Sequence, residues 1–469
     1  MSHNPVSRAI LASDLSFVPR LLWLGLPIAG QHLLMTALNM IDTIMVGQLG
    51  EAEIGAVALG NQIYFLLVLY LFGVGSGASV FTAQFWGRRD IPNIRRSLGV
   101  ALSLGLLGGG LFALGGVFFP RLLLSLYSTD PEVLGIGSDY LRIVALSYLF
   151  TAASMTLANV LRSVGDTRLP LIATGISIAL NSLFNYFLIF GVWIFPELGV
   201  RGAAISTAVA RTLEMGIMLF VIYRRRGPLA ASLAELLDFD APFFRRFLRR
   251  AAPVILNEIG WSVGFTMYTV VYARMGTPEL AAYNISEIVS RLAFVFFAGT
   301  GNAAAVIIGN AIGEGNEERA ASIGRSLILL APLTAALFGG VVYLISPVVP
   351  NLFAVSPEVK GMITALLRFF SFTIIAKVTN MHIIVGILRG GGDTTYGLFL
   401  DVGMLWIFGV TSAFYFGLVV GLPVHLVYLI HNSEELGKLL FGLPRVISGR
   451  WINNVTEPAP EIATMEMGP

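Results

Sequence analysis

Long apolar stretches separated by short polar connections run through most of the chain. Read with a window of about 19 residues, this pattern predicts twelve helices, each long enough to cross the roughly 30 Å hydrocarbon core of a membrane. The last predicted span is the weakest, because His431, Asn432, Glu434 and Glu435 interrupt it. The twelve expected spans lie near residues 21–46, 56–80, 98–119, 139–161, 169–194, 200–223, 251–273, 281–308, 323–346, 362–388, 395–420 and 422–441.

The distribution of basic residues indicates how these helices are oriented. Most Lys and Arg residues fall in the two termini and the even-numbered connections, including the polar stretch 224–250. The odd-numbered connections hold only Arg121, Arg201, Arg274 and Lys360. By the positive-inside rule we expect both termini and the central stretch to be cytoplasmic.

An internal repeat is the strongest sign of domain organisation. A shift of 226 residues places Pro27 on Pro253 and aligns several glycines, and a shift of 227 places LRSVGDT (161–167) on LRGGGDT (388–394). Because six spans separate the copies, both halves should have the same orientation, as two parallel six-helix bundles around a cleft. The expected division is an N-lobe at 1–223 (spans 1–6), a cytoplasmic linker at 224–250, a C-lobe at 251–441 (spans 7–12) and a cytoplasmic tail at 442–469.

Composition agrees with an all-α membrane protein and narrows its function. Of 469 residues, 56% are hydrophobic and 12% are charged, against about 25% charged in soluble proteins. The formal net charge of +2 argues against a nucleic-acid partner. Without cysteine, and with only five scattered histidines, thiolate metal sites are excluded, an enzyme is disfavoured and no cofactor is expected. Two complete lobes in one chain would make a monomer sufficient.

Polar residues within the N-lobe spans predict a cation site, since a charged group inside a membrane needs a partner or water. His32, Met35, Asn39 and Asp42 share one face of the first span by helical spacing. Asp42 has no basic residue within a turn, so another helix or a bound cation must compensate it, unless it simply lies at the outer mouth.

Spans 5 and 6 add polar side chains that suit such a site. Amide and hydroxyl oxygens are ligands that Na⁺ accepts, although the same groups also make ordinary interhelical hydrogen bonds. One face of span 5 and the start of span 6 carry Thr174, Ser177, Asn181, Asn185, Ser206 and Thr207.

The seventh span has an aromatic face that would suit an organic cation. Glu258, Trp261, Phe265 and Tyr268 follow helical spacing, and rings with one carboxylate attract a cation. Packing is the alternative, because aromatic stripes more often serve the core.

The remaining intramembrane charges are expected to pair. Spacing favours Glu287 with Arg291 and Arg211 with Glu214, at i, i+4 and i, i+3. Lys377 and Asp401 lack local partners and are predicted to form a structural pair with each other.

At several motifs the chain resembles the multidrug and toxic compound extrusion (MATE) family, in its bacterial NorM-like branch. The resemblance covers nearly the whole chain and implies a secondary antiporter that exports amphiphilic, often cationic drug-like molecules in exchange for Na⁺ or H⁺ by alternating access. It also implies a bacterial inner-membrane location. The motifs are LNMIDTIMVGQLG (38–50), FGVGSGASV (72–80), AQFWGRRD (83–90), the two LR(x)3DT loops and GRWINNVT (449–456).

Matched residue by residue, the resemblance assigns the N-lobe site. Asp42 falls on the family's span 1 carboxylate, Asn181 on its span 5 asparagine and Thr207 on a span 6 threonine. Asn185 replaces an aspartate of some members, which leaves the choice between Na⁺ and H⁺ open.

The match in the C-lobe is looser. Family members with a span 7 glutamate carry it eight residues after the proline, but Glu258 follows Pro253 by only five. Asp393 matches a loop aspartate, and its repeat twin Asp166 suggests that both cap helices. The alternative function is a lipid-linked oligosaccharide flippase of the same superfamily, which should need a strongly basic cavity.

Overall fold

The computed structural model describes residues 15–457, and their regular structure is helical. The first half contains α1 (Val18–Val46), α2 (Glu51–Gly87), α3 (Ile91–Phe118), α4 (Pro120–Leu124), α5 (Pro131–Ala145), α6 (Tyr148–Ser163), α7 (Arg168–Phe190) and α8 (Val200–Arg225). The short α9 (Leu233–Leu236) lies in the connection to the second half.

The second half begins with three long helices and ends in a helical region of mixed α and π turns. Its elements are α10 (Ala241–Met275), α11 (Thr277–Gly313), α12 (Glu317–Ile345), η3 (Val349–Leu352), α13 (Pro357–Met381), η4 (His382–Leu388), α14 (Thr394–Leu398), η5 (Phe399–Gly403), η6 (Leu405–Val410), α15 (Thr411–Phe414), η7 (Tyr415–Val419), α16 (Val424–Asn432) and α17 (Glu434–Ile447).

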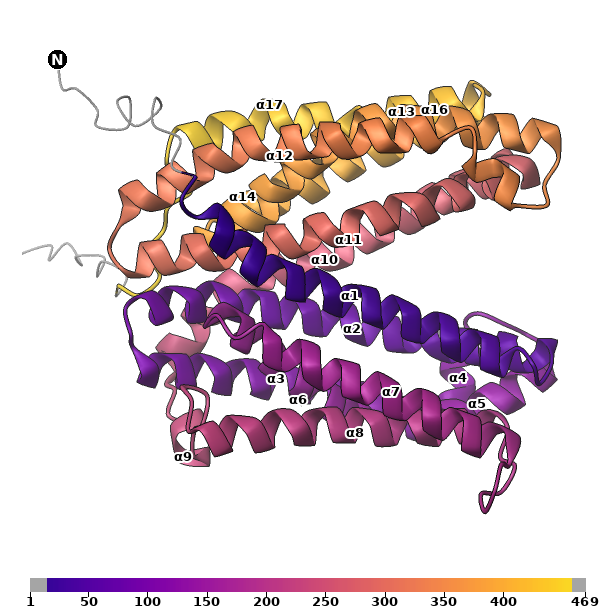
Figure 1. The fold of residues 1–469 in the computed structure, drawn as a ribbon, viewed down its shortest axis with the longest axis horizontal. Helices are drawn as coiled ribbons and strands as arrows, with labels where there is room; N and C mark the ends of the chain where they lie inside the picture. Colours follow the sequence, from indigo (N-terminus) through magenta and orange to yellow (C-terminus); the bar gives the residue numbers. More distant parts are fainter. Residues whose placement is uncertain (1–14, 458–469) are drawn as a thin grey trace, which may run out of the picture.

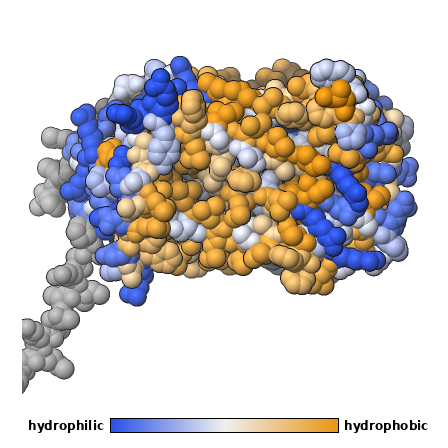
Figure 2. Space-filling model, turned by 90° about the horizontal axis from the view of Figure 1, so that it is seen from below, coloured by the Kyte–Doolittle hydropathy of each residue, from blue (hydrophilic) through white to orange (hydrophobic). Residues whose placement is uncertain are grey.

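The helices form two bundles that meet at one end and diverge toward the other (Figure 1). Within the described residues, ten helices are long and apolar enough to cross a membrane, and α5 with α6, bent by 52°, makes an eleventh. The twelfth predicted span corresponds to α16 and α17, which contain buried charges. Figure 2 shows an apolar band between two hydrophilic ends, as expected of a protein that spans a membrane.

The internal repeat is visible in the geometry. Helices α2 and α11 both have 37 residues, and each is followed by a residue that caps the next helix. The N–H of Asn93 donates to Asp90 Oδ1 at 3.2 Å, and the N–H of Arg319 donates to Asn316 Oδ1 at 2.9 Å. Two bundles related by a parallel repeat are therefore confirmed.

The first helix of each lobe begins inside the other lobe. Phe17 and Leu21, at the start of α1, are buried in a cluster of C-lobe side chains. Their repeat equivalents Phe243 and Phe247, in α10, are buried in a cluster of N-lobe side chains. This reciprocal packing removes apolar area from water in both lobes. A tilt of α1 or α10 therefore changes the packing in the opposite lobe.

The converging end is tightly closed. A side-chain carbon on Gly87 would overlap the backbone of Asn310, and one on Gly313 would overlap the backbone of Gln84. This symmetric crossing of α2 and α11 requires glycine because the two backbones are in contact. The chain after α17 adds a further seal, since the N–H of Val455 donates to Gln84 Oε1 at 2.7 Å.

Candidate functional site

The four predicted N-lobe residues lie together in one hydrogen-bonded network across three helices. Asn185, on α7, donates to Asp42 Oδ1 on α1 at 2.6 Å. In the amide orientation that satisfies its neighbours, Asn181 also donates to Asp42 Oδ1, at 3.0 Å, and its oxygen accepts from the N–H of Thr207 on α8 at 3.2 Å. Ser206, beside Thr207, donates to Asn185 Oδ1. The network joins one carboxylate to several amide and hydroxyl oxygens, which are ligands that a hard monovalent cation accepts.

The packing of α7 explains why these amides face Asp42. Asn181 and Asn185 are one helical turn apart and buried at 2% and 0% exposure, on the face of α7 that meets α1 and α8. A buried amide must use its donors and acceptors within the protein, so each asparagine bonds to a polar neighbour. Ser177 on the same face donates to the carbonyl of Ala210 at 2.9 Å, which ties α7 to α8.

The Asp42 carboxylate is not locked to a basic side chain. Arg211 lies near enough to act on it electrostatically, but its salt bridge is with Glu214 at 2.9 Å, as predicted from their spacing. Among residues 15–457, no Lys or Arg forms a salt bridge with Asp42. No group of three acidic or histidine ligands is found there either, so cation binding in the N-lobe would rest on Asp42 with neutral oxygens.

The other residues of the first-span stripe are not bonded to Asp42. Met35 and His32 are partly buried, and Asn39 is exposed. His32 interacts electrostatically with Arg162 of α6. The shared face predicted from spacing therefore divides into two environments along the helix.

In the C-lobe, the structure gives Glu258 an arginine partner that the sequence had placed in a cytoplasmic connection. Arg389 Nη2 lies 2.6 Å from Glu258 Oε1 and donates to Asn257 Oδ1 at 2.7 Å. Its other amino group donates to Ser76 Oγ of the N-lobe at 3.3 Å. The free carboxylate expected at this position is therefore neutralised by an ion pair at the lobe interface.

The aromatic face of α10 is divided. Trp261 is 39% exposed and its ring lies 4.4 Å from that of Phe265. Tyr268 is buried, and its hydroxyl donates to Glu434 Oε2 at 3.0 Å. Tyr268 therefore belongs to the interior of the C-lobe, which leaves Trp261 and Phe265 as the accessible part of the predicted aromatic wall.

The predicted pair between Lys377 and Asp401 is wrong. Asp401 pairs with Lys438 at 2.9 Å and also accepts from Asn257 at 3.2 Å, whereas Lys377 lies over the ring of Tyr428, 6.0 Å from its centroid. Lys438 donates to Oδ1 of Asp401 and Asn257 donates to its Oδ2, so both carboxylate oxygens have partners other than Lys377.

Lys438 is the centre of a charge cluster that sequence reasoning missed. Besides Asp401 it contacts Glu434 at 3.4 Å and Glu435 at 3.5 Å. The i, i+3 and i, i+4 spacing of these residues was available as a signal, but the sequence suggested only an interrupted last span.

One further predicted pairing fails, and one of two predicted helix caps is absent. Glu287 and Arg291 form no ion pair within 4.0 Å in the part of the chain that the structure describes, although they interact electrostatically. The two loop aspartates also differ. Asp166 accepts the N–H of Leu169 at 3.0 Å and so caps a helix, but Asp393 makes no cap and instead accepts from Arg445 at 2.8 Å.

The MatE family model matches residues 27–187 and 253–415 of the chain, one match in each lobe. A probable multidrug resistance protein NorM of Thermotoga maritima is 27% identical over 446 residues, covering 92% of each chain. A probable multidrug resistance protein NorM of Rhizobium meliloti is 28% identical over 418 residues, covering 85% of this chain and 86% of the relative.

Solved structures agree with the fold. The crystal structure of MATE in the bent conformation superposes with a TM-score of 0.84 at 20% identity, covering 95% of this chain and 98% of the other. A transporter of the MOP superfamily from Pyrococcus furiosus superposes with a TM-score of 0.82 at 20% identity, covering 96% and 100%. The two-bundle architecture is thus shared over nearly the full length of the chain.

Proposed function

Since the chain belongs to the MatE family, we propose that it is a multidrug efflux antiporter, which exports amphiphilic, often cationic small molecules in exchange for Na⁺ or H⁺. One observation carries the antiport part of this proposal. Asp42 is held by the amide of Asn185 beside further neutral oxygens, and its carboxylate has no salt bridge among the described residues. Multidrug export is supported by the relatives named NorM, which are described as probable multidrug resistance proteins.

The closed and diverging ends define the direction of transport in this proposal. The bundles are closed where α2 and α11 cross, at the end that carries the Arg-rich connections and where the described part of the chain, residues 15–457, begins and ends (Figure 1). The positive-inside rule makes that end cytoplasmic, so the conformation is outward-facing. Asp42 lies four residues before the end of α1, toward the diverging end, and an external cation would reach it from there.

Exchange follows if cation binding changes the preferred position of α1. A cation at Asp42 would compete with the hydrogen bond from Asn185 and loosen the contact between α1 and α7. Because α1 begins within the C-lobe cluster, its movement would alter the contact between the lobes. A ligand shifts the two states only by its difference in affinity between them, so the ion drives export only if it binds one state more tightly.

The flippase alternative is less consistent with the charges inside the molecule. A lipid pyrophosphate would need several free basic groups. Arg211 is paired with Glu214, Arg389 with Glu258, and Lys438 with acids of α17. Arg162, Arg291 and Lys377 form no salt bridge among the described residues, but they lie on three different helices and only Arg162 lines the polar cavity between the lobes.

Efflux from proteoliposomes tests the proposal. We expect ethidium efflux when either a Na⁺ gradient or a pH gradient is imposed separately, and loss of that dependence in Asp42→Asn. Asp139→Asn is the matched control, because Asp139 is a surface carboxylate paired with Arg201, and it should retain wild-type efflux. Gradient-driven efflux by Asp42→Asn at the wild-type rate would contradict the coupling role, and no efflux from the wild type under either gradient would contradict the antiport.

A further inference from the structure

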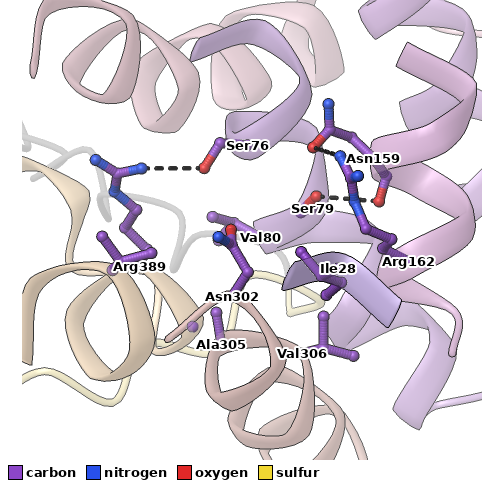
Figure 3. Close-up of a pocket in the computed structure, with 12 residues that line it drawn as sticks. Ile28, Ser76, Ser79, Val80, Asn159, Arg162, Asn302, Ala305, Val306 and Arg389 are labelled. Atoms are coloured by element: carbon purple, nitrogen blue, oxygen red, sulfur yellow. Dashed lines mark hydrogen bonds between the residues drawn. The ribbon is translucent and has the colours of Figure 1, made fainter. Parts of the chain in front are cut away.

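A small polar cavity lies where the two lobes meet, near the closed end. Its volume is about 30 Å³, room for roughly two water molecules and far below the several hundred Å³ of a drug-sized pocket. Figure 3 shows that its walls come from both lobes. Its polar lining consists of Ser76, Ser79, Asn159, Arg162, Asn302 and Arg389.

The two arginines of this cavity are equivalent positions of the internal repeat, each the second residue of an LR(x)3DT loop. Each donates to an amide on the first helix of its own lobe, and those amides are equivalent as well. Arg162 Nη1 donates to Gln31 Oε1 at 2.7 Å, and Arg389 Nη2 donates to Asn257 Oδ1 at 2.7 Å. The cavity therefore lies between two matching cation positions.

The symmetry ends at the next residue. After Asn257 comes Glu258, which neutralises Arg389 at 2.6 Å. After Gln31 comes His32, which supplies no negative charge. Within residues 15–457, Arg162 forms no salt bridge. Its second hydrogen bond goes to the neutral Asn159 Oδ1, at 2.9 Å.

The acid that Arg162 reaches through hydrogen bonds is already occupied. Gln31 donates to Thr174 at 2.9 Å, and Thr174 donates to Glu214 Oε1 at 2.7 Å. Glu214 is the salt-bridge partner of Arg211 at 2.9 Å. The Glu214 carboxylate is therefore shared by Arg211, which contacts it directly, and Arg162, which is linked to it only through Gln31 and Thr174. The positive charge of Arg162 beside the cavity is not balanced.

We propose that this cavity binds a small inorganic anion of the size of chloride. The anion neutralises the charge of Arg162, as Glu258 neutralises that of Arg389. A guanidinium has five N–H donors, and Arg162 uses only part of this capacity on Gln31 and Asn159. Ser76 accepts from Arg389, so its hydroxyl hydrogen is free to donate into the cavity. The volume suits a compact anion and is far too small for a whole drug-sized molecule.

Anion binding would also favour the closed arrangement of this end of the molecule. Ser76 and Arg162 belong to the N-lobe and Asn302 and Arg389 to the C-lobe, so separating the lobes dismantles the cavity. A ligand that binds one arrangement better stabilises that arrangement.

Thermal unfolding of the purified full-length protein in detergent tests the proposal without requiring transport, so its outcome is independent of the proposed function. Midpoints are compared in sodium chloride and sodium gluconate at equal Na⁺ concentration and ionic strength. We expect chloride and bromide to raise the midpoint saturably, by about 2 °C, and gluconate to have no such effect because it is too large. Equal midpoints in chloride and gluconate would overturn the proposal.

Two variants identify the site. Arg162→Gln removes the unbalanced charge, and Asn302→Leu fills the cavity while leaving both arginines in place; each should lose the chloride response. Arg201→Gln, which removes an arginine paired with Asp139 at the surface, should keep it. A full chloride response in Arg162→Gln would refute the assignment. If Arg162→Gln does not fold, Asn302→Leu replaces it, and a full chloride response in Asn302→Leu would likewise refute the assignment.

Discussion

The ion pair between Glu258 and Arg389 provides a quantitative test of the lobe interface. Its N–O distance is 2.6 Å, and the two side chains are 14% and 6% exposed. At an effective dielectric constant of about 20, charges this close attract by about 6 kcal/mol. Desolvation of both ions offsets most of that energy. We therefore expect a net coupling of about 2 kcal/mol between the two residues.

A double-mutant cycle measures this coupling. The wild type, Glu258→Gln, Arg389→Gln and the double variant are compared by thermal unfolding in detergent, followed by tryptophan fluorescence. Arg389→Gln should be the more damaging single change, because it leaves the Glu258 carboxylate without a cation, whereas Glu258→Gln leaves Arg389 bonded to Asn257. The double variant should lie about 2 °C above the midpoint that the two single changes predict by addition.

An exposed pair of similar geometry is the control. Arg201 and Asp139 are 2.7 Å apart but 63% and 40% exposed, so solvent screening should reduce their coupling to under about 1 kcal/mol. If the Glu258 and Arg389 variants act additively, or couple no more than the exposed pair, the assignment of a buried ion pair within the C-lobe is incorrect.

Three further predictions concern the charged site, the C-lobe cluster and the closing segment. Asp42→Asn should melt within about 1 °C of the wild type, because asparagine can still accept from Asn185, so a large drop would mean that lost transport reflects misfolding. Lys438→Met should destabilise the protein by at least about 3 kcal/mol, since three buried carboxylates lose their cation; size-exclusion recovery equal to that of Lys438→Arg would argue against this. Trp451→Ala should cost about 3–5 kcal/mol, because this fully buried ring packs against Gly391; an unchanged melting midpoint would disprove its packing role.

The N-lobe network shows how far spacing along helices can predict a site. Asp42, Asn181 and Asn185 were singled out because each lies on a polar face of an otherwise apolar helix. In the structure the faces meet, with Asn185 donating to Asp42 at 2.6 Å. The side chains converge because a polar face in a membrane helix must face protein or water, which leaves few alternatives; their role in ion coupling stays a prediction.

Long-range charge pairing could not be predicted in the same way. Asp401 was assigned to Lys377 and is paired with Lys438, although all three lie in predicted C-lobe spans. Helical spacing says which side chains share a face but not which helices adjoin, nor how far a flexible lysine reaches.

The sequence by itself determined the positions of most apolar spans, the doubling of a six-helix unit and the polar faces, because these depend on local periodicity and on matches within the chain. Only the tertiary structure decided that α1 and α10 begin in each other's lobes, that Glu258 neutralises Arg389, and that Arg162 lies beside a cavity without an acidic partner among the described residues. Those features depend on how helices distant in sequence pack against one another, and packing is set by the fit of many side chains at once.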